Sequence, residues 1–332
     1  MATLSATNPT LLDWKNSLDP DGSVASVIEI LNQQNEILDD MTFMEGNLPT
    51  GNKTTIRSGL PTPTWRKLYG GVQPSKSRRV QVTDNCGMLE DYAEVDCALA
   101  DLNGNTNEFR LSEARGHIEA MSQELVDTTF YGDESVNPER FTGLASRYND
   151  LSAENADNII PGGGSGADNA SIWLVVWGPE TCHMIVPKGS QAGIQVNDKG
   201  QVTIENVDGN GGRMEAYRTH FRQDAGLTLK DWRYVVRIPN IDKSALTKDA
   251  SAGADIIDLM TQALEVVPNL NMGRPVFYAP RTIRSFLRRQ IVNKVASSTL
   301  AMGEVAGRKV VQFEDVPVRR CDALAGDEAA VT

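Results

Sequence analysis

The histidines and cysteines are the side chains in this 332-residue chain best suited to act as bases, nucleophiles or metal ligands. His117 falls inside an apolar stripe, His183 directly follows Cys182, and His220 lies in a strand-like stretch. Neighbouring residues on a strand point to opposite faces, so Cys182 and His183 do not form a metal-binding pair. We therefore interpret each of the three histidines as a structural residue.

The short motifs give no catalytic signature. The four cysteines form no C-x-x-C pair, and we expect them to be reduced thiols (Cys86, Cys97, Cys182 and Cys321). The glycine-rich segment 161–170 lacks the G-K-[ST] ending of a phosphate-binding loop and the last glycine of a G-x-S-x-G turn, so we interpret it as a linker or mobile loop. We expect no cofactor, no metal and no enzymatic activity, although a pair of catalytic carboxylates would leave no motif.

The composition is that of a folded globular protein, and the length suggests roughly two domains or one elaborate domain. Hydrophobic residues make up 40% and charged residues 23%, which argues against a disordered, collagen-like or coiled-coil chain. The longest apolar run, 172–177, is far shorter than the roughly 20 residues of a membrane span. Residues 1–13 have neither the basic nor the apolar part of a signal peptide. We therefore expect a soluble protein made in a cytoplasm, with no membrane partner.

The charges are segregated along the chain. The net charge of −12 argues against a nucleic-acid binder over the whole surface. Residues 16–45 contain seven acidic and no basic residues, 46–83 contain seven basic and no acidic residues, and 84–108 again contain seven acidic and no basic residues. Three consecutive blocks of alternating sign differ from a randomly mixed, solvated surface.

The basic block has the pattern of a two-stranded arm. Proline and glycine divide it into short extended pieces, and β-branched residues alternate over 54–57 and 79–83, with a turn near Tyr69-Gly70-Gly71. Because an isolated two-stranded arm is marginally stable, we expect it to lie on an acidic surface. Identical copies can then pair arm to flank, head to tail, as in rings and lattices. The alternatives are a solvated basic hairpin and a nucleic-acid-binding hairpin in which Trp65 stacks on bases.

Periodicity predicts the remaining elements. Helices are expected over 23–38, 107–130, 254–267 and 282–300, the second with an apolar stripe (Leu111, Ala114, Ile118, Met121 and Leu125) and with Gly132 as its C-terminal cap. Strands are expected over 171–177, 182–186, 194–196 and 202–204, the last two joined by a turn at 197–200. A long strand pair is expected over 213–223 and 229–238, closed by Pro239, with a final strand over 310–318. The order of strands and helices is typical of an α+β protein.

Three arginines share one face of the last expected helix. Arg281, Arg284 and Arg288 are spaced three and four residues apart, with Arg289 beside them. We consider three interpretations of these arginines, with the simplest first: a solvated face paired with acidic residues, a charged subunit contact, and a phosphate contact.

Several segments, in order along the chain, resemble the major capsid proteins of tailed bacteriophages. They are NEILDDMTFMEGN (35–47), TTIRSGLP (54–61), TWRK (64–67), FYGD (130–133), FTGL (141–144) and GLTLKDWRYVVRI (226–238). The resemblance is greatest to capsid proteins of short-tailed phages of the Bordetella phage type. It implies an α+β Hong Kong 97-like capsid fold with an N-terminal arm (1–45), an extended β-hairpin loop (46–92), a peripheral domain with a long spine helix (93–155 and 310–332) and an axial domain (156–309).

The resemblance also implies a function in the virion. Hexamers and pentamers of the chain would form an icosahedral shell around double-stranded DNA, with weak, non-specific DNA contact and assembly in the bacterial host cytoplasm. It implies a portal and a cementing protein as partners. The sequence lacks the long helical N-terminal segment that serves some relatives as a scaffold, so a separate scaffolding protein is expected. No motif pairs a loop lysine with an asparagine and a catalytic acid, so we expect no covalent crosslinks.

We expect the contacts between subunits to be charged. The loop would contribute Lys53, Arg57, Trp65, Arg66, Lys67, Arg78 and Arg79; its partners on a neighbour would include Glu90, Asp91 and Glu94, and the helix would contribute Arg281, Arg284 and Arg288. Two other functions stay open at this point: a nanocompartment shell of the same fold that encloses an enzyme, and an α+β enzyme with a motif-free site.

Overall fold

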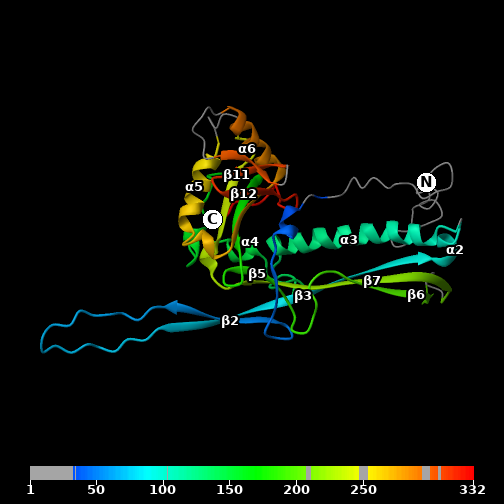
Figure 1. Ribbon diagram of the computed structural model, residues 1–332, viewed down its shortest axis with the longest axis horizontal. Helices are drawn as coiled ribbons and strands as arrows, with labels where there is room; N and C mark the ends of the chain where they lie inside the picture. Colours follow the sequence, from blue (N-terminus) through cyan, green and yellow to red (C-terminus); the bar gives the residue numbers. More distant parts are fainter. Residues whose placement is uncertain are drawn as a thin grey trace. The chain divides into compact units, whose positions relative to one another are not determined.

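The computed structural model describes residues 33, 35–102, 104–206, 211–246, 253–293, 300–305 and 308–332. They form two compact units (Figure 1). The spine unit contains Met88–Leu125 and Gln191–Asp224, and the core unit contains Gln34–Gly87, Val126–Ser190 and Ala225–Thr332. Within these residues no helix has the length and hydrophobicity of a membrane span.

The core unit is built on a mixed sheet with β4 (Asn169–Trp177) at its centre. All nine residues of β4 are buried, and its last six form the continuous apolar run 172–177. It pairs antiparallel with β8 (Val235–Asp242) and β9 (Arg274–Ala279), and β9 pairs in parallel with β12 (Val316–Arg320). β5 (Cys182–Val186) pairs with β4 at Trp177 and joins it to the end of β7 (Arg213–Leu229).

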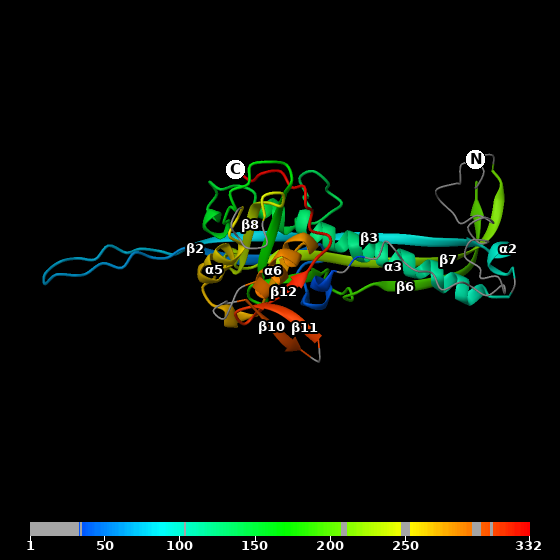
Figure 2. The same cartoon turned by 90° about the horizontal axis from the view of Figure 1, so that it is seen from above.

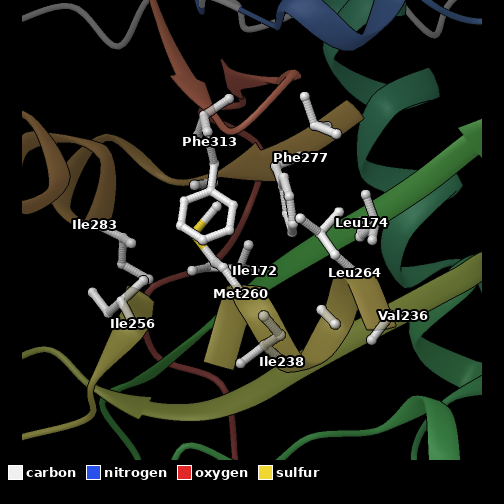
Figure 3. Close-up of a cluster of buried hydrophobic side chains, with 14 of the residues drawn as sticks. Ile172, Leu174, Val236, Ile238, Ile256, Met260, Leu264, Phe277, Ile283 and Phe313 are labelled. Carbon is white, nitrogen blue, oxygen red and sulfur yellow. The ribbon is translucent and has the colours of Figure 1, made fainter. Parts of the chain in front are cut away.

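Two helices cover this sheet and close its hydrophobic core. Figure 3 shows Met260 and Leu264 of α5 (Ile256–Val266) among the side chains of Ile172, Phe277 and Phe313. Helix α6 (Arg281–Asn293) adds Ile283 and Leu287 to the same cluster. The expected helix at 282–300 is therefore too long, because Leu300 begins β10 (Leu300–Val305), while residues 294–299 lie outside the described part of the chain.

The glycine-rich segment lines the edge of β8. The amides of Gly162 and Gly164 donate to the carbonyls of Pro239 and Asn240 at 2.8 and 2.7 Å. A Cβ atom at Gly164 would lie 2.7 Å from the Asn240 carbonyl oxygen, so this approach to the backbone of β8 requires glycine. The segment thus covers a strand edge that would otherwise stay unpaired, a function that its composition does not indicate.

Two of the expected turns lie within continuous strands. β6 (Gln195–Glu205) runs through residues 197–200 with a register shift, because Gly200, at φ +69°, donates its amide to Asp198 Oδ1 at 2.8 Å. β8 likewise continues through Pro239, where its register on β4 shifts and Asn240 takes φ +61°. The expected hairpin at 197–200 and the expected strand end at Pro239 are both wrong, since an irregularity in a strand has the same composition as a turn.

Strand partners also differ from the expectation. β7 pairs with β6 and β5, whereas β8 pairs with β4, so the expected pair 213–223 with 229–238 is wrong. The strand expected at 310–318 is a hairpin of β11 (Arg308–Phe313) and β12. The helix expected over 23–38 falls largely outside the described residues, and its end forms the 3₁₀ turn η1 (Glu36–Asp39).

The long helix is confirmed as α3 (Thr106–Tyr131). Met121 and Leu125 of its stripe are buried, but Leu111 is 56% exposed and the stripe is shorter than expected. Gly132 ends the helix without a positive φ; it is required because a Cβ there would lie 2.3 Å from the Phe141 carbonyl oxygen.

The other elements are β1 (Phe43–Glu45), β2 (Gly51–Gly59), β3 (Arg78–Asp96), α2 (Cys97–Ala100), α4 (Leu144–Arg147), η2 (Ala156–Asn158), η3 (Trp232–Tyr234) and η4 (Leu270–Met272).

Candidate assembly surface

The basic block forms the expected antiparallel hairpin. β2 pairs with the first part of β3, with Lys53 opposite Thr83 and Arg57 opposite Arg79. Beyond the paired region the two chain segments continue to a turn, visible at the far end of the hairpin in Figure 2. Tyr69 takes φ +61° there, and the amide of Gly70 donates to the Lys67 carbonyl at 3.0 Å. The predicted turn at Tyr69-Gly70-Gly71 is confirmed.

The hairpin carries charge and apolar surface that nothing in the described chain covers. Trp65 and Tyr69 are fully exposed, and Leu60 and Leu68 are 78% and 86% exposed. Exposed apolar residues gathered in this way typically mark an interaction surface. Within the described residues, the basic side chains of the hairpin are all exposed and none forms an ion pair (Lys53, Arg57, Arg66, Lys67, Lys76, Arg78 and Arg79).

The root of the hairpin is fixed to the core unit. β1 pairs in parallel with β5, and the Gly46 amide donates to the Val186 carbonyl at 2.8 Å. The Asn47 side chain binds both backbone groups of Lys53 at 2.8 Å each. A Cβ atom at Gly51 would lie 2.0 Å from the Asp84 carbonyl oxygen, so the close approach of β2 and β3 at this position requires glycine. The tip is therefore exposed while the root is tightly packed.

The acidic residues expected to receive a neighbour's hairpin already have partners in their own chain. In the spine unit, Glu90 contacts His220 at 3.1 Å, Asp91 contacts His117 at 2.5 Å, and Glu94 Oε1 lies 2.6 Å from Arg218 Nε. The sequence did not reveal these pairs, because α3 and β7 contribute partners that lie from 26 to 130 residues away in the chain. Two of the histidines thus have the structural function expected, and the contact between subunits stays a prediction.

The arginines of α6 have different environments. Arg284 is half-buried and contacts Glu36 at 3.3 Å, so it holds the N-terminal segment of its own chain. Arg281 reaches Asp322 at 3.0 Å with most of its side chain exposed, and Arg288 is exposed. A contact with another subunit through these residues stays a prediction, for which Arg281 and Arg288 are the accessible members.

Two of the four cysteines and one of the three histidines are buried (Cys182, Cys321 and His183). Burial raises the pKa of the Cys182 and Cys321 thiols to about 12, so both are protonated and poorly nucleophilic near neutral pH. Burial also lowers the pKa of His183, which stays neutral. Among the described residues, no three side chains of His, Cys, Asp or Glu are placed to hold a metal ion. The arrangement of exposed residues favours association of protein surfaces.

Comparison with known proteins agrees with this interpretation. The major capsid protein GP7 family matches residues 19–332. The chain is 37% identical to a chain of the bacteriophage epsilon15 structure, with 100% of each chain covered and a TM-score of 0.79. No match is found among curated proteins.

Two further solved structures are more distant. The bacteriophage JBD30 capsid is 10% identical, with 89% of this chain and 92% of that chain covered and a TM-score of 0.48. The SrpI encapsulin complex of Synechococcus elongatus PCC 7942 is 9% identical, with 73% and 93% covered and a TM-score of 0.42. Both scores are too low to carry weight beside the family match. The chain has a Hong Kong 97-like capsid fold, belongs to the major capsid protein GP7 family and is the major capsid protein of a tailed phage.

Proposed function

We propose that copies of this chain associate as hexamers and pentamers into a closed icosahedral shell around double-stranded DNA, and that the basic hairpin forms the principal contact with a neighbouring copy. The observation that carries the proposal is the set of seven exposed basic side chains on one hairpin, none of which forms an ion pair within the described residues, together with the exposed Trp65 and Tyr69. A surface of this kind gains both apolar burial and charge complementarity when it docks.

The chemistry of the contact follows from the charges. Lys53, Arg57, Arg66, Lys67, Arg78 and Arg79 would reach carboxylates of a neighbour, with Glu90, Asp91 and Glu94 as the candidates. Within the chain Glu90 contacts His220 and Arg222, Asp91 contacts His117, and Glu94 contacts Arg218, and each carboxylate has further acceptor sites. A neighbour's guanidinium would therefore extend an existing pair into a network, while Trp65 supplies apolar contact area. Arg281, Arg284 and Arg288 would form a second charged contact.

The four regions assigned from the resemblance give each part a place in this shell. Residues 1–45 would be the arm, 46–92 the extended loop, 93–155 with 310–332 the peripheral domain, and 156–309 the axial domain. Assembly would take place in the bacterial host cytoplasm with a separate scaffolding protein, a portal and a cementing protein, and without crosslinks. DNA contact would be weak and non-specific, and the phage would be of the short-tailed Bordetella phage type.

Electron microscopy and sedimentation of the full chain test the proposal. The chain would be expressed alone and together with the genes beside it, and the particles analysed for nucleic acid and protein content. Closed shells or rings of five and six support it. A small, monodisperse species under both conditions would contradict assembly, and shells that contain an enzyme instead of DNA would indicate a nanocompartment.

A further inference from the structure

A buried ion pair lies at the root of the hairpin. Arg147 Nη2, at the end of α4, is 2.9 Å from Asp84 Oδ1 on β3, and the two side chains are 18% and 3% exposed. The same nitrogen also contacts the carbonyl oxygens of Thr142 and Leu227 at 3.3 and 3.2 Å. Of the charged side chains from Gly46 to Gly87, Asp84 is the one with an ion pair in the described structure. One guanidinium thus joins β3, β7 and α4.

This pair lies in an incompletely satisfied polar environment. Asp84 Oδ2 and Arg147 Nε have no hydrogen-bond partner in the described structure. Next to Leu227, Thr228 stands opposite His183 in the β5–β7 ladder, and Thr228 Oγ1 and His183 Nδ1 are also without partners. Buried polar groups of this kind cost stability compared with apolar residues of the same size. Stability alone therefore gives no reason for an ion pair at this position.

Strand register gives such a reason. Asp84 stands opposite Asn52 in the β2–β3 ladder, where the buried root meets the exposed hairpin. A slip of β3 by one residue would turn Asp84 to the other face of the strand and leave Arg147 opposite Thr83 or Asn85. The guanidinium would then be buried without a counter-charge, which is far more costly than the paired state. The Asp84–Arg147 pair therefore forms in one register of β3 only and disfavours the registers shifted by one residue.

We propose that Arg147 is a positioning residue for the hairpin: by holding Asp84 it fixes the register of β3 and hence the direction in which the basic surface is presented. The inference rests on the proposed function of the hairpin in assembly. It adds a largely buried residue outside the hairpin on which assembly depends.

Three variants of the full chain separate positioning from stability. Arg147→Met leaves the Asp84 charge buried and unpaired, whereas Asp84→Leu/Arg147→Met removes both charges and carries the test even if the single variant fails to fold. Thr228→Val removes a neighbouring buried hydroxyl that makes no hydrogen bond and is the matched control. Each would be measured by thermal unfolding, by hydrogen exchange of residues 46–59 and 78–87 in unassembled subunits, and by particle yield.

In the double variant we expect stability to be restored while the order of the hairpin root and the particle yield are not. Its melting temperature returns to that of the wild type, while amides at the root exchange about 100-fold faster and the particle yield falls about tenfold or more. Thr228→Val changes none of the three. If the double variant regains slow exchange and normal yield, the pair is only a stability element and the inference is wrong. If the root exchanges fast but shells form normally, hairpin direction does not govern assembly; charge reversal of Arg78 and Arg79 tests the hairpin itself separately.

Discussion

The guanidinium of Arg237 and the carboxylate of Glu328 lie 2.7 Å apart, 91 residues apart in the chain, with both side chains more than nine-tenths buried. Arg237 also donates to the Tyr148 carbonyl at 2.8 Å, and the Tyr131 hydroxyl donates to Glu328 at 2.6 Å. This network holds the C-terminal segment against β8.

Glu328→Ala should lower the free energy of unfolding by about 3–5 kcal/mol, because Arg237 would stay buried without its counter-charge. Asp327→Ala, at an exposed neighbouring position, is the matched control and should change it by about 0.5 kcal/mol or less. Urea unfolding of unassembled subunits measures both. Equal effects of the two substitutions would show that the Arg237–Glu328 pair contributes nothing specific.

Asp40 should make stability depend on pH. Its carboxylate is fully buried, 2.7 Å from Arg274 Nη2 and 3.2 Å from Arg319 Nη2, and it accepts a hydrogen bond from Tyr278. Burial raises the pKa of Asp40 above its ordinary value of 3.8, against the effect of these three partners.

The sign of this dependence follows from proton binding. A carboxyl whose pKa is raised by folding binds its proton more tightly in the folded chain, so its contribution to stability decreases as pH rises from 3.8 to the raised pKa. The difference in unfolding free energy between wild type and Asp40→Asn should therefore fall over this range. Urea titrations at a series of pH values measure it, and a difference that grows with pH would contradict the raised pKa.

The turn between β11 and β12 should tolerate glycine better than its own residue. Glu314 takes φ +52°, where a side chain is strained. Glu314→Gly should raise the free energy of unfolding by about 0.5–1 kcal/mol, whereas Glu314→Ala, which keeps the Cβ, should not. Thermal unfolding compares the two variants. An equal gain in stability from alanine would show that the effect comes from removing the Glu314 charge and not from relief of backbone strain.

Elements with a strong local pattern could be predicted from the sequence. The apolar run of β4, the i, i+3, i+4 spacing of α3 and α5, and the proline- and glycine-rich basic hairpin all appear where their sequences indicate. In each, neighbouring residues alone determine the periodicity. The register shifts in β6 and β8 could not be predicted, because Gly200 and Pro239 are typical of turns and only strand pairing shows otherwise.

The charges of the candidate site were only half predictable. The composition of the hairpin shows that its cations have no acidic residues beside them in the chain, and in the part of the chain that the structure describes they form no ion pair. It does not show that Glu94 is already paired with Arg218, or Asp84 with Arg147, since those partners come from strands and helices far along the chain. Pairing between distant elements is a property of the fold, so these contacts required the structure.

Trp65 should contribute to assembly without contributing to folding. Its side chain is fully exposed in the subunit, so Trp65→Ala should change the free energy of unfolding by no more than about 0.5 kcal/mol. Loss of a large aromatic contact should nevertheless raise the critical concentration for assembly by about tenfold or more. Light scattering over a concentration series measures this, and an unchanged critical concentration would remove Trp65 from the proposed contact.

The most direct test of the central claim is charge reversal on the hairpin, Arg78→Glu/Arg79→Glu, with Lys188→Glu/Lys199→Glu as a control of equal charge change at exposed positions outside it. Electron microscopy and sedimentation would compare particle formation, and circular dichroism would establish folding. The account predicts folded subunits and no shells from the hairpin variant, with shells from the control. Normal shells from the hairpin variant would contradict it.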